Sequence, residues 1–123
     1  MPDRYISKIQ SSLTPDLLKP EYRALNDNNP MYGHCYAATE ALFHLLGGIA
    51  SGWYPLRGKD DNGITHWWLR NDAGEIVDPT AEQYTSLGLS PPYKNGRRGG
   101  FLTGYERPSK RARIIIAKVQ DEE

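Results

Sequence analysis

The sequence predicts an α+β domain in which a central helix packs on a small antiparallel sheet, with further helices preceding it at the N-terminus. Two observations carry this prediction. Residues 37–46 form an alanine- and leucine-rich run typical of a buried helix, and residues 64–78 have the pattern of a β-hairpin. The chain has 123 residues, which suits one modest hydrophobic core, so we expect a single domain over residues 1–123.

Composition excludes several classes of protein. Lys plus Arg and Asp plus Glu both number 15, so overall charge indicates neither a nucleic-acid-binding nor an acidic protein. A single cysteine excludes an internal disulfide framework and a multi-cysteine zinc site, and it fits a reducing compartment. Residues 1–10 contain no apolar signal-peptide core, and no apolar run is long enough to span a bilayer. We therefore expect a cytoplasmic protein, with delivery into another cell left open.

Two short helices are expected ahead of the central one. Residues 2–12 have helical apolar spacing at Tyr5, Ile6, Ile9 and Leu13. Thr14 then suits an N-cap and Pro15 a first helical position, so a second helix is predicted over residues 15–18.

The central helix is expected over residues 35–46, with Gly47 and Gly48 ending it. Its alanines imply that another element approaches closely. Glu40 and His44 are four residues apart on the opposite face, so we expect both to contact water.

The sheet is expected to contain a strand within residues 49–56, a central strand at residues 64–70 and a return strand at residues 75–78. Asp72-Ala73-Gly74 reads as a three-residue hairpin loop with Gly74 in the left-handed position. The Gly- and Pro-rich residues 85–104 indicate a long loop. In residues 110–119, three consecutive isoleucines favour a strand, whereas the Ser109 cap and the apolar spacing favour a helix, which we prefer.

Cys35 is the candidate nucleophile because it precedes the central helix. The helix dipole and the free N–H groups of the first turn favour the thiolate there, and the thiolate is the reactive form. A lone cysteine is nevertheless more often a small buried apolar residue. A nucleophile also needs a base, and three histidines are available. His34 is adjacent and should point away, His44 lies over two turns along the helix, and His66 on the central strand can face the helix start.

The hairpin register supplies an acceptor for His66. With a three-residue loop, Asn71 pairs with Glu75 and Trp68 pairs with Asp78. His66 and Asp78 then share one face of the sheet as diagonal neighbours, with their backbones about 7–8 Å apart. A four-residue loop would put Asp78 on the wrong face. In the simpler interpretation, His66 is a core histidine and Asp78 only initiates a turn before Pro79.

Chemical roles follow from this arrangement. Cys35 attacks a carbonyl carbon, His66 accepts and returns the proton, and Asp78 orients His66. The backbone N–H of Cys35 and the side chain of Asn29 are the candidate oxyanion donors. Trp67 and Trp68 are interpreted as core or cleft wall, with Trp68 also considered for stacking on substrate.

The motifs resemble those of papain-like and transglutaminase-like cysteine enzymes. Gly33-His34-Cys35-Tyr36 is similar to their G-x-C-aromatic stretch, and residues 66–69, Gly74 and residues 77–80 resemble the H-x-W…G…V-D-P-T hairpin of the transglutaminase-like group. The resemblance covers roughly residues 30–84. His34 stands where Gln is common and Tyr36 where Trp is common, which leaves the substrate and the exact reaction open.

The resemblance implies a papain-like or transglutaminase-like core and acyl-transfer chemistry through a thioester. The possible reactions are peptide or amide hydrolysis, as by a thiol protease, glutamine deamidation, and transamidation, on a protein or peptide substrate. No metal or organic cofactor is implied. A metal site built from Cys35 and the three histidines would match no zinc spacing.

A binding module is the alternative function. The segment 93–113 interleaves Tyr93, Phe101 and Tyr105 with basic residues, a composition that can hold single-stranded nucleic acid or an acidic protein. The basic residues proposed for such a partner are Lys94, Arg97, Arg98, Arg107, Lys110 and Arg111. A solvated loop and helix face is the simpler interpretation.

Overall fold

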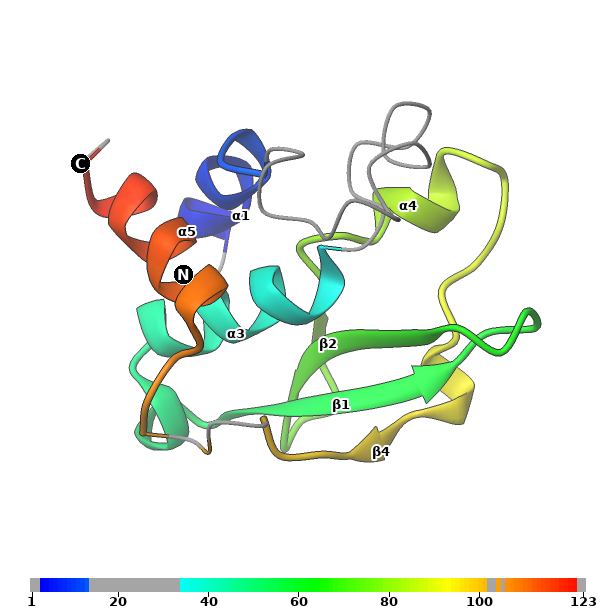
Figure 1. Ribbon diagram of the computed structural model, residues 1–123. Helices are drawn as coiled ribbons and strands as arrows, with labels where there is room; N and C mark the ends of the chain where they lie inside the picture. Colours follow the sequence, from blue (N-terminus) through cyan, green and yellow to red (C-terminus); the bar gives the residue numbers. More distant parts are fainter. Residues whose placement is uncertain (1–2, 14–33, 102–103, 105, 122–123) are drawn as a thin grey trace.

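The computed structural model describes residues 3–13, 34–101, 104 and 106–121, which combine helices with one antiparallel sheet (Figure 1). The sheet has four strands in the order β3-β2-β1-β4. Its strands are β1 (Trp53–Lys59), β2 (Thr65–Asn71), β3 (Ile76–Val77) and β4 (Arg97–Arg98). The predicted α+β class is therefore confirmed, and the predicted central strand β2 lies inside the sheet.

The helices form two layers above the sheet. The described elements are α1 (Asp3–Ser11), α3 (Cys35–Leu45), α4 (Glu82–Thr85), α5 (Lys110–Asp121) and the 3-10 segments η2 (Gly48–Ser51) and η3 (Tyr93–Asn95). Figure 1 shows α3 lying between the sheet and the pair α1 and α5, and α3 contacts all three. None of the helices in the described ranges is both long and apolar enough to cross a membrane. The second N-terminal helix predicted at residues 15–18 lies outside the described residues.

Small side chains let α3 approach the sheet closely. Ala37, Ala38 and Ala41 are at most 1% exposed and pack in one cluster with Trp67 and Leu69 of β2. The Thr39 hydroxyl donates a hydrogen bond of 3.1 Å to the Trp67 carbonyl, which joins the helix directly to the strand. The close approach that the alanines indicate fixes the distance between the start of α3 and β2.

The expectation that Glu40 contacts water is wrong, whereas His44 is partly exposed. Glu40 is fully buried, and His44 is half-buried. The Glu40 carboxylate accepts hydrogen bonds from the Ser109 backbone N–H at 2.9 Å and from the Ser109 hydroxyl at 2.6 Å. The polar face of α3 is therefore covered because Glu40 holds the start of α5, a tertiary contact that helical spacing does not reveal.

The predicted hairpin register is confirmed. The Asn71 N–H donates to the Glu75 carbonyl at 3.1 Å, and Leu69 pairs with Val77. Gly74 has φ +83, the left-handed conformation that the three-residue loop requires. The same register places Trp68 opposite Asp78, two residues from His66.

Other boundaries differ from expectation. The strand expected at residues 49–56 begins only at Trp53, because η2 and glycines with positive φ turn the chain first. The long loop at 85–104 contains η3 and the edge strand β4, which residues Arg97 and Arg98 do not signal. Residues 110–121 form the helix α5, as preferred, and the Ser109 hydroxyl accepts from the Ala112 N–H at 3.4 Å.

Replacing Ser109 tests the junction between α3 and α5. We expect Ser109→Ala to lower the free energy of unfolding by about 1–3 kcal/mol, because the helix loses its cap and the buried Glu40 carboxylate loses a donor. Urea denaturation measures the change. Ser11→Ala is the matched control, since the exposed Ser11 hydroxyl bonds only to carbonyls of its own helix, and it should change stability by less than about 0.5 kcal/mol. Equal losses in the two variants would contradict this account.

Candidate active site

Cys35 is the first residue of α3, where the sequence predicts it. Its side chain is 8% exposed, and its Sγ lies 3.7 Å from the Thr65 carbonyl at the start of β2. The first hydrogen bond of the helix runs from the Ala38 N–H to the His34 carbonyl, so the N–H groups of the first turn have no partner within the helix. The thiol thus lies at the positive end of the helix dipole and beside the central strand.

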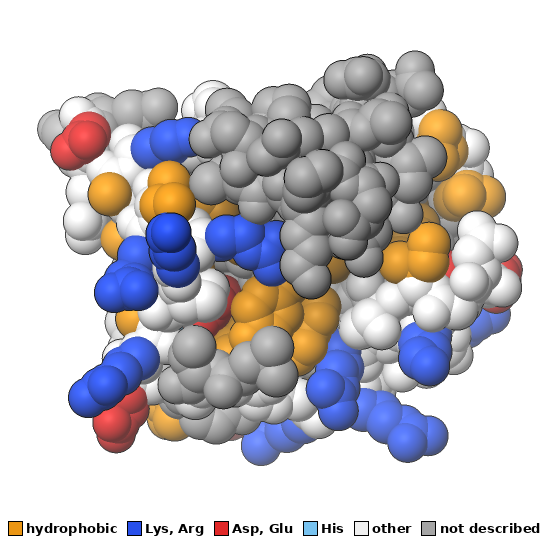
Figure 2. All heavy atoms as spheres, viewed as in Figure 1, with side chains coloured by type: hydrophobic (Ala, Val, Ile, Leu, Met, Phe, Trp, Pro, Cys, Tyr) orange, Lys and Arg blue, Asp and Glu red, His pale blue; other side chains and the backbone are white. Residues whose placement is uncertain are grey.

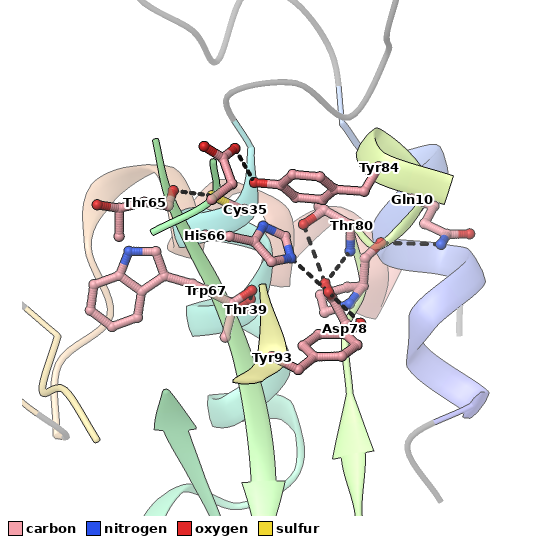
Figure 3. A network of polar contacts seen from close by, with 12 residues as sticks. Gln10, Cys35, Thr39, Thr65, His66, Trp67, Asp78, Thr80, Tyr84 and Tyr93 are labelled. Atoms are coloured by element: carbon pink, nitrogen blue, oxygen red, sulfur yellow. Dashed lines mark hydrogen bonds and ion pairs between the residues drawn. The ribbon is translucent and has the colours of Figure 1, made fainter. Parts of the chain in front are cut away.

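His66 and Asp78 meet across the hairpin as its register predicts. The His66 Nε2 lies 2.6 Å from the Asp78 Oδ2, and both side chains are almost completely buried. Figure 3 shows Cys35 beside the His66 imidazole, with Asp78 on the other side of the ring. The Nδ1 atom, which Asp78 leaves free, makes no hydrogen bond of good geometry. Nδ1 is therefore available to the Cys35 thiol, which interacts with the ring.

The charged form of His66 is favoured by its neighbours. Burial alone would lower the pKa of His66, but the hydrogen bond with Asp78 and the interaction with the Cys35 thiol raise it, from 6.5 to about 9. At neutral pH the imidazole is therefore protonated and lies between a carboxylate and a thiol. An imidazolium in this position stabilises a neighbouring thiolate.

The Asp78 carboxylate is held in place by further donors. The Tyr93 hydroxyl donates to Oδ2 at 2.8 Å, and the Thr80 N–H donates to Oδ1 at 3.1 Å. The Gln10 side chain donates to the neighbouring Pro79 carbonyl at 3.1 Å, which ties α1 to the same segment. Asp78 therefore accepts from three residues at once and is fixed toward His66. Tyr93 was not predicted, because only the fold brings η3 to this point, whereas the Thr80 contact is the local turn that Asp78 was expected to initiate.

A second carboxylate lies near His66. The Tyr84 hydroxyl donates to Asp60 Oδ2 at 2.8 Å, and the Tyr84 ring meets the His66 ring edge to face with centroids 4.9 Å apart. Partial burial would raise the pKa of Asp60, but donors from Ile64, Tyr84 and Asn62 and the charge of His66 lower it overall. Burial, followed by the bond to Asp60, raises the pKa of Tyr84, so it remains a donor. Neither Asp60 nor Tyr84 was predicted as a site residue, because only the fold brings the two side chains together.

The other predicted site residues are placed differently. Trp68 is fully buried against the Tyr93 ring, with centroids 5.2 Å apart, so stacking on a substrate is wrong for this residue and the core interpretation holds. Asn29 lies outside the described residues. His34 is buried at the N-cap position of α3, where its side chain makes no capping bond, and His44 lies in the last turn of that helix, where desolvation lowers its pKa. Neither histidine takes the position of His66.

Three of the six basic residues proposed for a partner line one groove. Lys94, Arg97 and Arg98 line a groove beside β1. Arg107, Lys110 and Arg111 lie before or at the start of α5 and do not line that groove. Across the described part of the chain, no cluster of three or more His, Cys, Asp or Glu side chains is arranged to hold a metal ion.

The arrangement joins a helix-terminal thiol, an imidazole and an orienting carboxylate, which together can perform nucleophilic attack with proton transfer. Comparisons of the chain with protein-family models, with curated proteins and with solved structures found no match.

The raised pKa of His66 predicts a pH-dependent stability. Folding favours the protonated ring, so its stabilising contribution is complete below pH 6.5 and is lost as the pH rises through about 9. The free energy of unfolding should fall by up to about 3 kcal/mol over that range. Urea denaturation between about pH 6 and about pH 10 measures it, with His66→Gln as the reference that lacks a titrating ring. The same pH slope in both proteins would contradict the assignment.

Proposed function

We propose that this chain is a cysteine-dependent acyl-transfer enzyme with a papain-like or transglutaminase-like core, using Cys35, His66 and Asp78 as a catalytic triad. The observation that carries the proposal is the 2.6 Å bond between His66 Nε2 and Asp78, which leaves the other ring nitrogen for the Cys35 thiol. A core histidine without a chemical role would not need a buried carboxylate on one side and a helix-terminal thiol on the other. This convergence supports catalysis over the simpler structural interpretations.

The reaction proceeds in two steps. The Cys35 thiolate attacks the carbonyl carbon of an amide or ester, and the new C–S bond forms as the carbonyl electrons move to oxygen. The His66 imidazolium then gives its proton to the leaving amine or alcohol, whose bond to carbon breaks and leaves a thioester on Cys35. In the second step, neutral His66 takes a proton from water or an amine, which attacks the thioester carbon. The C–S bond then breaks, the acid or amide product leaves, and the thiolate–imidazolium pair returns.

The oxyanion of each step forms beside the start of α3. The backbone N–H of Cys35 has no partner within the helix, so it can donate to this charge, and the helix dipole favours it. Asp78 keeps the ring in position and stabilises its charged form, and the Tyr93 hydroxyl donates to the same carboxylate oxygen, Oδ2. Peptide or amide hydrolysis, glutamine deamidation and transamidation share these steps and differ in the acyl donor and acceptor.

Acylation by p-nitrophenyl acetate tests the proposal. We expect a burst of p-nitrophenolate and one acetyl group on Cys35, detected by mass spectrometry and removed by hydroxylamine. Cys35→Ala should abolish the adduct. His66→Ala and Asp78→Asn should slow acylation on the order of 10²-fold or more, because proton transfer and ring orientation are lost.

His44→Ala is the matched control, since this histidine lies at the far end of α3, and it should acylate at the rate of the unmodified protein. Thermal unfolding of each variant separates lost chemistry from lost fold. The proposal is wrong if folded His66→Ala protein acylates as fast as the control, or if the acetyl group is found elsewhere.

A further inference from the structure

A basic groove opens beside β1 and β4. Its volume is about 820 Å³, and the lower edge of the face in Figure 2, over these strands, carries Lys and Arg side chains. None of its described lining residues is acidic. The residues that matter here are Thr65 and the cations Arg57, Lys59, Lys94, Arg97 and Arg98. Five cationic side chains therefore surround the groove, although acidic and basic residues are equal in number over the whole chain.

The walls of the groove are fixed by backbone contacts. A Cβ on Gly58 would lie 3.1 Å from the backbone of Asn95, so β1 and η3 pack closely there. The Asn95 side chain donates to the Lys59 carbonyl at 3.0 Å, and Arg57 pairs with Arg97 across β1 and β4. The cations therefore stand on a rigid frame, which is what a specific binding site requires.

Two of the arginines are positioned by aromatic rings. The Arg57 guanidinium lies 5.8 Å from the Trp67 ring centroid, and the Arg98 guanidinium lies 3.7 Å from that of Tyr54. A guanidinium that stacks on a ring keeps its N–H edges free for a bidentate carboxylate. Within the described part of the chain, these cations make one ion pair, between Arg98 and Asp72 at 4.0 Å, and it contributes little because both side chains are exposed. The positive charge of the groove is therefore largely uncompensated among the described residues.

The groove begins next to the candidate nucleophile. Thr65 lines the groove, and its carbonyl is the acceptor that lies 3.7 Å from Cys35 Sγ. Thr65 also pairs with Lys59 across β1 and β2. The groove and the thiol therefore share Thr65 as a direct neighbour.

The neighbouring aromatic residues argue for a polypeptide over a nucleic acid. Binding of single-stranded nucleic acid uses exposed rings on which bases stack. Trp67 and Phe101 are 8% and 5% exposed and stack on each other, and the Tyr93 hydroxyl is bonded to Asp78. Tyr105 lies outside the described residues. Phe101 therefore packs in the core and Tyr93 bonds to Asp78, so neither ring is free to stack on a base.

We propose that the basic groove is a substrate subsite for a polypeptide that carries Asp or Glu residues close to the reacting acyl group. This inference rests on the proposed function, because a substrate subsite needs the nucleophile beside it. Carboxylates would pair with the lysines and arginines of the groove and would bring the acyl carbon to Cys35.

Binding is measured first, in a form that needs no catalysis. A fluorescein-labelled peptide with glutamates around a central Gln-Gly is titrated into Cys35→Ala protein and followed by anisotropy, beside a peptide with lysines at those positions. We expect the glutamate peptide to bind at least about tenfold more tightly, since a few ion pairs supply that factor. The preference should weaken with salt, and Lys59→Gln/Lys94→Gln/Arg97→Gln should remove it.

A matched variant controls for overall charge. Arg107→Gln/Lys110→Gln/Arg113→Gln also removes three exposed cations, none of which lines the groove, and it should keep the preference. Loss of the preference in both variants, no preference in the starting protein, or tighter binding of a single-stranded oligonucleotide of equal charge would each overturn the proposal.

Labelling connects the groove to the thiol. The glutamate peptide carrying a vinyl sulfone should alkylate Cys35 about tenfold faster than its lysine counterpart, and the groove variant should erase the difference. Tight binding of the acidic peptide without faster labelling would show that the groove is not a substrate subsite. Failure of the proposed function appears separately, as the loss of acetylation by p-nitrophenyl acetate, a compound too small and too neutral to need the groove.

Discussion

The hydrogen bond between His66 and Asp78 depends on a three-residue loop, and the rest of the site depends on that bond. Side chains alternate along a strand, so one more residue in the loop would turn Asp78 to the opposite face of the sheet. With the observed register, Asp78 takes Nε2 of the ring and leaves Nδ1 toward Cys35. Tyr93 and Thr80 then occupy the remaining acceptor positions of the carboxylate, which offsets the cost of burying it. Loop length thus determines whether Asp78 can reach the His66 ring.

The position of the Cys35 thiol is fixed by the packing of α3, as the position of the His66 imidazole is fixed by the hairpin. The alanines of α3 allow the helix to lie close to β2, and the Thr39 hydroxyl bonds to the Trp67 carbonyl at their contact. On its other side the helix is held by α5, through the buried pair of Glu40 and Ser109. Buried polar groups with all partners in place make one arrangement much more stable than its alternatives. The position of Cys35 is therefore a property of the whole core.

Local signals were sufficient for the central part of this fold. The helix at Cys35, the hairpin with Gly74 and the Ser109 cap were predicted because each depends on residues close in sequence. The pairing of His66 with Asp78 followed by counting along the hairpin. The buried Glu40 and the contact of Tyr84 with Asp60 could not be predicted, since each joins segments that only the tertiary structure brings together. The edge strand β4 was missed for a related reason, because two arginines form a strand only where β1 offers them an edge.

The central claim is that Cys35 and His66 act as a thiolate–imidazolium pair. The rate of Cys35 alkylation by iodoacetamide, followed across pH in the folded protein, tests it most directly. The account predicts a fast reaction that persists well below about pH 8.5, the pKa of an ordinary thiol, and the loss of this behaviour in His66→Ala but not in His44→Ala. A rate profile like that of a free thiol, unchanged when His66 is replaced, would contradict the account.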